Sequence, residues 1–365
     1  MQPLASSDVS SVYSARTRWV VGLGFLLSGL CLWLFVRKLD LHAIAELPEL
    51  LMRWPLLVGV SIFMLEFVLR SLRWQLLLSP LGQAPLKHLI SITFISFTAS
   101  NLVVARSGEL VRPWLASRRL ELPLMPVITT TVLERIFDLL GLLSVFTLMV
   151  MTLPDHQLQG VSPIFLKMLE RVGKVGIIVG VLGMGGLFFF ATRERLLSVL
   201  VRWGEAYLPG PLARLSVKVL EGLSTGLQAF QSWRPPLLAL ALSGMIWING
   251  ALALWIMFDA FRLVLPFSAA CFLSVALALA VIPPQAPGFV GVWQLAVSHA
   301  LMAWGVQEQV AASFALVFWL VSFAPVTAIG ILCMLKEGLS LSRLLKDARG
   351  SAPTKPSAGE GLPTS

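Results

Sequence analysis

The run Leu263–Gln307, LVLPFSAACFLSVALALAVIPPQAPGFVGVWQLAVSHALMAWGVQ, contains 45 residues and no Asp, Glu, Lys or Arg. A helix that crosses the hydrocarbon core of a bilayer needs about 20 apolar residues, so this run can supply two membrane segments. Its centre, Pro283-Pro284-Gln285-Ala286-Pro287-Gly288, interrupts a helix because proline lacks the backbone donor and clashes with the preceding turn. The run therefore predicts either two full crossings or a re-entrant hairpin that turns at the Pro/Gly cluster.

The composition of the whole chain agrees with a membrane location. Of 365 residues, 57% are hydrophobic and 13% are charged, whereas a soluble domain carries about 25% charged residues. These values exclude a water-soluble enzyme built on one buried core. The net charge of +9 comes from Lys and Arg that lie mostly between apolar blocks, which is typical of the positive-inside rule. We therefore expect contacts with membrane lipids and none with nucleic acid.

Further apolar runs predict the remaining membrane segments. They are Trp19–Val36, Pro55–Leu78, Leu89–Ala105, Pro126–Leu153, Val175–Thr192, Pro235–Phe258 and Gln309–Leu335. The first is longer than the apolar part of a signal peptide, about 7–15 residues, and a basic pair follows it, so we interpret it as a retained anchor. The third is too rich in Ser, Thr and Asn to face lipid, which favours a re-entrant segment or a cavity-lining helix. The predicted fold is an all-α, polytopic transmembrane helix bundle with about eight crossings.

Charge also divides the chain into regions. A membrane domain at 19–335 follows a cytoplasmic tail at 1–18 and precedes a tail at 336–365 that is basic and then disordered. Within it, 193–234 has the pattern of basic amphipathic helices on the cytoplasmic surface. Counting Lys and Arg places both termini in the cytoplasm of a multi-pass inner (plasma) membrane protein, and it requires 89–105 to enter and leave on one side.

The two halves of the membrane domain share a pattern. Each contains ordinary spans, then an interrupted segment with a Gly- or Pro-bearing loop, then a long span. Interrupted segments in corresponding positions indicate an inverted repeat with a binding site at the repeat interface.

A first group of charged residues lies in the loop Ala105–Pro113. Arg106, Glu109 and Arg112 recur every three residues, so on a helical turn they share a face. Guanidinium groups bind phosphate oxygens in a forked geometry, and Glu109 can hold one arginine when no lipid is bound. These residues are candidates for binding a lipid headgroup. The alternative is a loop that only anchors the helix ends in the cytoplasm.

A second group, Glu134, Arg135 and Asp138, opens a long apolar run. Their spacing allows a compact cluster on one helix face. Ionisable residues at this depth cost roughly 2.5–3.5 kcal/mol each and usually face a cavity or a charged partner. We interpret the cluster as part of the substrate path, with a structural ion pair to Arg106 or Arg112 as the alternative. The intramembrane Glu66 has a simpler explanation, a pair with Arg70 one turn later.

Three uncharged residues are secondary candidates for the headgroup site, together with Glu66. Gly288 belongs to the Pro/Gly stretch Pro283–Trp293 and Gln294 follows it, and a new helix N-terminus near Gly288–Gly291 can face an anionic headgroup. Asn101 ends the polar run 89–105. The three cysteines and four histidines lack ligand spacing, so we expect no metal, no cofactor and no catalytic residue.

The two charged motifs and the Pro/Gly stretch, in this order, resemble the family of the lysylphosphatidylglycerol synthase transmembrane region, also called flippase-like. The resemblance rests on Ala105–Pro113, Val132–Asp138 and 283–291, and it extends over about 19–335. It implies an integral membrane protein of six to eight crossings. The best understood members join this region to an aminoacyl transferase domain and move the modified phospholipid between leaflets. Other members stand alone and are linked to translocation of lipids or lipid-linked sugars.

The resemblance makes the six charged residues of the two motifs headgroup candidates. The chain departs from relatives at Gln294, where they often have Glu, and at Phe318-Trp319, where they often have Arg. The loss of one charge of each sign is consistent with a lost ion pair and weakens the expectation of a lysyl-lipid substrate. The cytosolic segments are too short for a catalytic domain, so we do not expect an enzyme. The alternatives are a scaffold subunit for a partner lipid-modifying enzyme and a membrane-embedded headgroup transferase.

Overall fold

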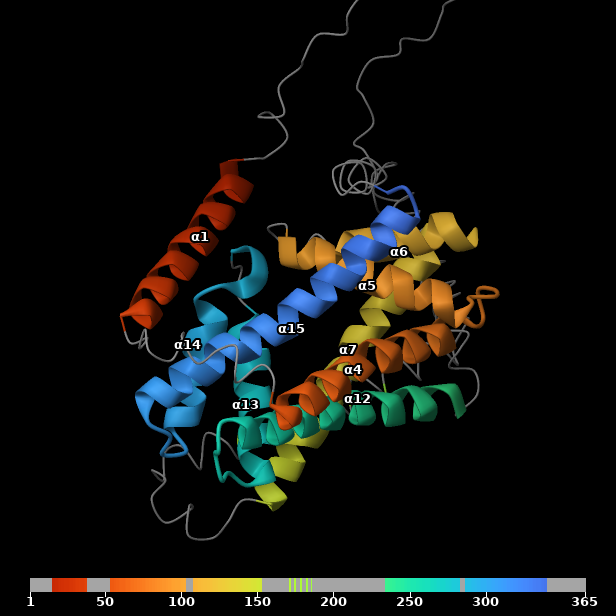
Figure 1. Ribbon diagram of the computed structural model, residues 1–365. Helices are drawn as coiled ribbons and strands as arrows, with labels where there is room; N and C mark the ends of the chain where they lie inside the picture. The colour runs from red at the N-terminus through yellow and green to blue at the C-terminus, as the bar shows by residue number, and fades with distance from the viewer. Residues whose placement is uncertain are drawn as a thin grey trace, which may run out of the picture.

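The computed structural model describes residues 15–37, 53–102, 108–152, 234–282 and 286–339, and five isolated positions between 171 and 185. Over these residues the chain is α-helical, with one short 3-10 turn and no strand (Figure 1). The elements are α1 (Ala15–Val36), α4 (Trp54–Leu78), α5 (Leu86–Leu102), α6 (Gly108–Leu120), α7 (Leu124–Met151), α12 (Arg234–Ala260), α13 (Phe267–Ala280), η3 (Pro287–Phe289), α14 (Val292–Met302) and α15 (Glu308–Lys336). The predicted all-helical fold is confirmed.

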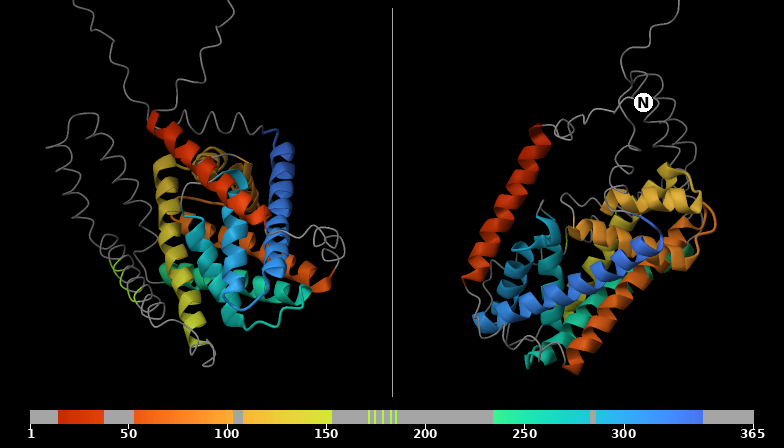
Figure 2. Two further views of the ribbon diagram at one scale, coloured as in Figure 1. Left: turned by 90° about the vertical axis from the view of Figure 1, so that its left-hand side faces the viewer. Right: turned by 45° about the horizontal axis from the view of Figure 1, so that its top comes forward.

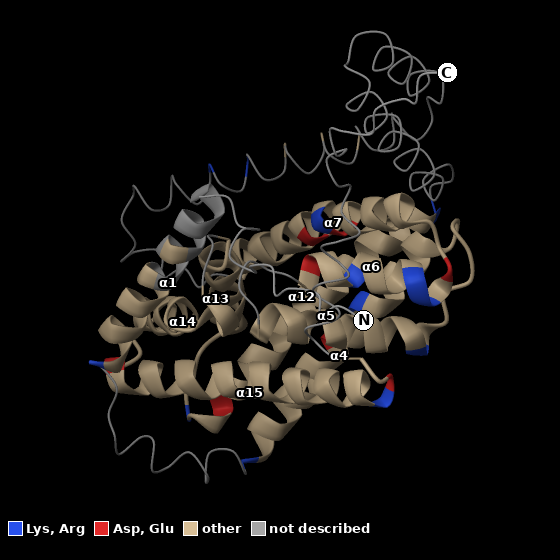
Figure 3. Cartoon of the chain, turned by 90° about the horizontal axis from the view of Figure 1, so that it is seen from above, with Lys and Arg blue, Asp and Glu red and all other residues tan. Residues whose placement is uncertain are grey.

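Within the part of the chain that the structure describes, three helices, α4, α12 and α15, are long and apolar enough to cross a membrane. Helix α7 has 28 residues and includes the charged group that begins at Glu134. Many large apolar side chains on these helices point outward, such as Leu57, Val150 and Leu332, as expected for a surface that lipid covers. Figure 3 shows α13 and α14 wholly in tan, whereas charged residues gather around α4, α6 and α7. The number of crossings stays a prediction, because the Val175–Thr192 segment and the 193–234 insert lie almost entirely outside the described residues.

Helices α4 and α12 pack along each other as an antiparallel pair. At one end, Arg53 Nη1 donates to the carbonyl oxygen of Ala260 over 2.5 Å. Further along, Asn249 Nδ2 donates to the carbonyl oxygen of Ile62 over 2.8 Å. The residue numbers rise on one helix as they fall on the other, which fixes the antiparallel direction.

The described helices form two sets with the same order of elements. Each set has a long helix, two shorter helices and another long helix: α4, α5, α6, α7 and then α12, α13, α14, α15. Because α4 and α12 are antiparallel, the two sets have opposite directions, which is the geometry of an inverted repeat. Helix α5 packs on α15 and α13 packs on α7, so each set contacts the closing helix of the other. In Figure 2, left, α7 and α15 stand at opposite sides with α13 and α14 between them.

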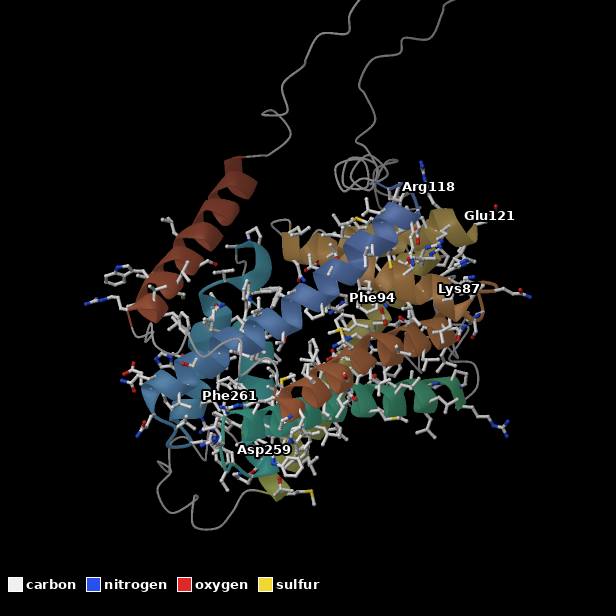
Figure 4. The ribbon with its side chains drawn as sticks, in the orientation of Figure 1. Lys87, Phe94, Arg118, Glu121, Asp259 and Phe261 are labelled. Atoms are coloured by element: carbon white, nitrogen blue, oxygen red, sulfur yellow. The ribbon has the colours of Figure 1, made fainter. Side chains whose placement is uncertain are left out.

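The short helices form two helical hairpins, α5 with α6 and α13 with α14, each between two long helices. At 1.5 Å per residue, α13 and α14 span about 21 and 17 Å, less than a hydrocarbon core of about 30 Å. In Figure 4, Lys87 at the start of α5 lies near Arg118 and Glu121 at the end of α6, while Asp259 and Phe261 lie at the opposite end of the molecule. The first hairpin therefore begins and ends at the same end of the molecule, which is the geometry that the predicted entry and exit on one side requires.

The second hairpin enters from the opposite side. Helix α15 runs parallel to α4, since Phe63 contacts Phe318 and Phe67 lies in one cluster with Val326. It is therefore antiparallel to α12, and the segment that joins these two helices begins and ends on the same side. Of the two interpretations of Leu263–Gln307, this geometry supports the re-entrant hairpin.

Candidate functional site

A cavity of about 520 Å³ lies between the two hairpins, and both sets of helices line it. Its charged lining residues are Glu66, Arg70, Glu109, Arg112, Arg135 and Asp138. Its aromatic lining residues are Phe63, Phe67, Phe97, Phe289, Trp293, Phe318 and Phe323, together with Trp247. The cavity thus joins a charged part to an aromatic and aliphatic part inside a membrane-spanning bundle.

The spacing along α4 explains how one helix supplies both parts. Phe63, Glu66, Phe67 and Arg70 stand at i, i+3, i+4 and i+7, so they share one face. The aromatic side chains come first along this face, and Arg70 comes last. Phe63 contacts Phe318 of α15, Phe67 stacks on Phe94 of α5, and Arg70 pairs with Asp138 of α7. These contacts direct the face toward the cavity.

Behind the charged part lies a buried carboxylate, Glu134, which is 0% exposed. Its Oε2 accepts a hydrogen bond from Arg112 Nη1 over 2.5 Å, and its Oε1 lies 3.4 Å from Arg73 Nη2. Arg73 is 1% exposed and also donates from Nη1 to Ser243 Oγ over 2.8 Å. Glu134 therefore joins α4, α6 and α7 in one ion network.

A second carboxylate, Asp138, faces the cavity and contacts three arginines. Its Oδ1 lies 2.8 Å from Arg73 Nη1 and 3.3 Å from Arg70 Nη1, and its Oδ2 lies 3.5 Å from Arg135 Nη1. Arg70 is also held by Glu66 over 2.6 Å. Buried charges are tolerated only when they are paired, and this network pairs each carboxylate with at least one guanidinium.

The structure separates the predicted residues into two kinds. Glu109, Arg112, Arg135 and Asp138 line the cavity. Glu134 does not line it and instead holds Arg112, which is the ion pair that the sequence offered as the alternative. Arg135 has a side chain that is 54% exposed, so it is the most accessible of these guanidinium groups. Arg106 lies outside the described residues.

The secondary candidates also divide. Glu66 forms its predicted pair with Arg70 and lines the cavity, as does Asn101, whose Nδ2 donates to Thr327 Oγ1 over 3.1 Å. The other two stabilise the turn of the second hairpin. The carbonyl oxygen of Gly288 accepts from the indole N–H of Trp319 over 2.8 Å. Gln294 Oε1 accepts from the backbone N–H of Gly291 over 2.7 Å and caps α14.

Sequence reasoning missed Arg73 as a member of the site. Its charge was used only to orient the chain, although a second arginine three residues after Arg70 inside an apolar span was a signal of an intramembrane partner. Trp74 was missed as well: its ring lies 4.0 Å from the guanidinium of Arg112, and its Nε1 donates to Thr130 Oγ1. This cation–π contact gives Arg112 a second support besides Glu134.

A family model described as "Lysylphosphatidylglycerol synthase TM region" matches residues 21–330. The chain belongs to this family. The match includes every described residue that lines the cavity, so the site lies within the family's membrane region. Membership also establishes the protein as an integral membrane protein. Comparisons with curated proteins and with solved structures found no match to the chain.

Proposed function

We propose that this member of the family binds a phospholipid or a lipid-linked headgroup in the cavity and moves it between the two leaflets. The observation that carries the proposal is the amphipathic cavity, with three arginines and three carboxylates in its charged part and aromatic rings in the rest. A lipid has the same division into a charged head and an apolar body.

The charged part suits a phosphate-bearing headgroup. Guanidinium groups bind phosphate oxygens through paired hydrogen bonds, and Arg135 has room to do so because its contact with Asp138 is long. Glu66 and Asp138 present carboxylate oxygens to any hydroxyl or amine of the same headgroup. Since Arg73 and Glu134 lie behind the cavity, they keep the binding groups in position while a lipid arrives or leaves.

The inverted hairpins support movement between leaflets. In transporters built from inverted repeats, access alternates when one repeat moves against the other around a site near the bilayer midplane. Here a cavity lies between hairpins that enter from opposite sides. Small changes at the contact of η3 with α5 would open it to one leaflet or to the other.

Charge favours one orientation. The end of the molecule that carries Lys87, Arg118 and Arg234 has an excess of basic residues. At the other end, the negative charge of Asp259 balances the positive charge of Arg262. The positive-inside rule places the basic end in the cytoplasm. Helix α15 ends there, so the C-terminus would be cytoplasmic in an inner-membrane protein.

The test is leaflet exchange of fluorescent phospholipids in proteoliposomes that contain the purified chain. Arg135→Gln removes an accessible cavity charge and leaves the network around Glu134 in place. Since a hydrogen bond to a charged group contributes about 1.5–3 kcal/mol, we expect exchange to slow by about 10- to 100-fold. Arg118→Gln is the matched control, because Arg118 is exposed on α6 outside the cavity.

Three outcomes contradict the proposal. Exchange by Arg135→Gln at the rate of the unmodified chain would show that the cavity charge does not bind the lipid. An inactive chain that co-purifies with a stoichiometric enzyme would favour a scaffold subunit. Metal-dependent modification of a headgroup by the chain alone would favour a transferase.

A further inference from the structure

The cavity opens on the outer surface of the bundle. Among the described residues that line it, four are exposed: Glu109, Arg135, Leu139 and Ile282. Leu139 is 37% exposed and Ile282 is 64% exposed, whereas a residue of the inner wall such as Phe67 is buried. A lining residue with this much free surface lies where the cavity meets the outside. The exposed residues therefore mark the mouth of the cavity.

The mouth lies between α7 and α13. These helices are in contact at one level, because Val145 of α7 and Cys271 of α13 belong to one hydrophobic cluster. They are antiparallel, since α7 begins at the basic end of the molecule and α13 begins shortly after Asp259 at the other end. Toward the basic end, Leu139 stands six residues before Val145 and Ala278 stands seven residues after Cys271, which is about 9 and 10 Å. Leu139 and Ala278 are therefore at about the same level on the two helices, and both line the cavity.

A second pair of lining residues lies one turn beyond the first. Arg135 precedes Leu139 by four residues, so the two share a face of α7. Ile282 follows Ala278 by four residues, and the intervening Val281 still has helical backbone angles. The rim of the mouth thus consists of Arg135 and Leu139 on one side and of Ala278 and Ile282 on the other.

The mouth lies at the depth of the hydrocarbon core. Helix α7 begins at Leu124, at the basic end of the molecule. Arg135 and Leu139 follow by eleven and fifteen residues, which places them about 16 and 22 Å along the helix axis. A hydrocarbon core is about 30 Å thick, so a mouth at this depth opens sideways into the bilayer.

An exposed arginine at this depth requires an anion. The side chain of Arg135 is 54% exposed, and its contact with Asp138 is long, at 3.5 Å. A charged side chain that faces hydrocarbon is costly, and such residues face a charged partner or a water-filled cavity. The phosphate of a lipid at the mouth supplies that partner. The rest of the rim, Leu139, Ala278 and Ile282, is apolar and suits acyl chains.

The volume of the cavity determines which part of a lipid can enter. At about 520 Å³, it lies within the range of about 300–1,000 Å³ that is typical of pockets for drug-sized molecules. A phospholipid headgroup with its glycerol is a molecule of that size. Two long acyl chains in addition exceed it, so they have to remain in the bilayer.

We propose that the mouth between α7 and α13 is a lateral portal for phospholipids of the surrounding bilayer. The headgroup enters the cavity past Arg135, and the acyl chains stay outside, against Leu139, Ala278 and Ile282. This inference rests on the proposed function and deepens it, because it assigns the route of the lipid and the part of it that the protein encloses.

The first experiment maps the two parts of the lipid separately. Phosphatidylglycerol and phosphatidylethanolamine that carry a diazirine either in the headgroup or in an acyl chain are photolysed in proteoliposomes of the purified full-length chain. Labelled residues are identified by mass spectrometry. With at least one of the two lipids, the headgroup probe should label the inner wall at Phe67 and Phe318, which line the cavity and are buried. The acyl probe should label Leu139 and Ile282 but not the inner wall.

The second experiment narrows the mouth and measures leaflet exchange. Leu139→Trp and Ala278→Trp each place a large ring on the rim, and we expect exchange to slow by about tenfold or more, because an extra ring has to be displaced for a headgroup to pass. The matched controls are Val150→Trp on α7 and Leu279→Trp on α13, which are 48% and 49% exposed and do not line the cavity. Both controls should exchange lipid at the rate of the unmodified chain. Thermal unfolding of each variant identifies one that is slow only because it does not fold.

The outcomes separate the portal from the proposed function. If both rim variants exchange lipid at the rate of the controls while Arg135→Gln is slow, the portal is wrong and the proposed function stands. Labelling of Phe67 or Phe318 by the acyl probe also overturns the portal, because the chains would then enter the cavity. If the unmodified chain exchanges no lipid but the two probes label as expected, movement between leaflets fails and the portal stands as the entrance to a binding site. If neither headgroup probe labels the inner wall, the portal is overturned.

Discussion

Glutamine in place of Glu134 keeps the shape of the side chain and removes its charge. In the folded protein Glu134 is fully buried, and it is the carboxylate that contacts Arg112, at 2.5 and 3.4 Å from its two terminal nitrogens. After the substitution, Arg112 keeps the face of Trp74 but loses its anionic partner. Arg73 is less affected because Asp138 and Ser243 still hold it over 2.8 Å.

The magnitude follows from the burial. Removing one partner of a buried ion pair costs about 3–5 kcal/mol, because the remaining charge is left without compensation. With 2–4 °C for each kcal/mol, as in domains of 150–250 residues, the unfolding temperature should fall by about 6–20 °C. The measurement is thermal unfolding in detergent, with the exposed Glu121→Gln as the control, for which we expect no change. A second variant, Arg112→Met with Glu134→Leu, should recover much of the loss, since an apolar pair replaces both charges.

An unfolding temperature of Glu134→Gln equal to that of Glu121→Gln would contradict a stabilising role of the Glu134 ion pair. That role is also refuted if the double variant is less stable than Glu134→Gln alone. Either result would mean that the network does not join α4, α6 and α7 in the manner described.

Three further predictions test the packing and the topology. Gly330→Ala should destabilise the protein by about 1–3 kcal/mol in thermal unfolding, because the new Cβ would lie 2.6 Å from the carbonyl oxygen of Phe94. Gly244→Ala is the control and should leave the stability unchanged, because a Cβ there has no neighbour closer than 3.9 Å. In a chain without its three native cysteines, the variants Lys87→Cys and Arg118→Cys should react with an impermeant maleimide from the cytoplasmic side. The variant Asp259→Cys should react from the opposite side. Labelling of Lys87→Cys and Arg118→Cys from different sides would contradict the re-entrant hairpin. Glu337→Gln should lower the stability by less than about 1 kcal/mol in the same unfolding assay, because its bridge to Arg119 is partly exposed.

Local sequence signals were enough to predict the long apolar helices and the break between α13 and α14. They did not predict α6, because residues 108–113 were expected in a loop, whereas Gly108–Leu120 is helical. The expected segment Pro55–Leu78 differs from α4 by one residue, because the apolar run and its proline mark the helix limits directly. The inverted order of the two sets was also visible as a pattern of interrupted segments. These features depend on residues near one another in the sequence.

The division of roles within the site was not predictable in the same way. Glu134 and Asp138 are one turn apart, so spacing alone gives them the same environment. Their neighbours differ, because α6 brings Arg112 against Glu134 while α4 brings Arg70 against Asp138.

The packing of α5 on α15 also affects the synthesis of the protein. Thr98 donates to the carbonyl oxygen of Val326, which is added to the chain 228 residues later. At about 5–20 residues per second, the ribosome needs about 10–45 s to reach that partner. During this interval Thr98 must find a temporary partner, because lipid offers none. Until α15 is made, the first hairpin therefore lacks the helix that α5 packs against, and its packing is completed only when the last described helix joins it.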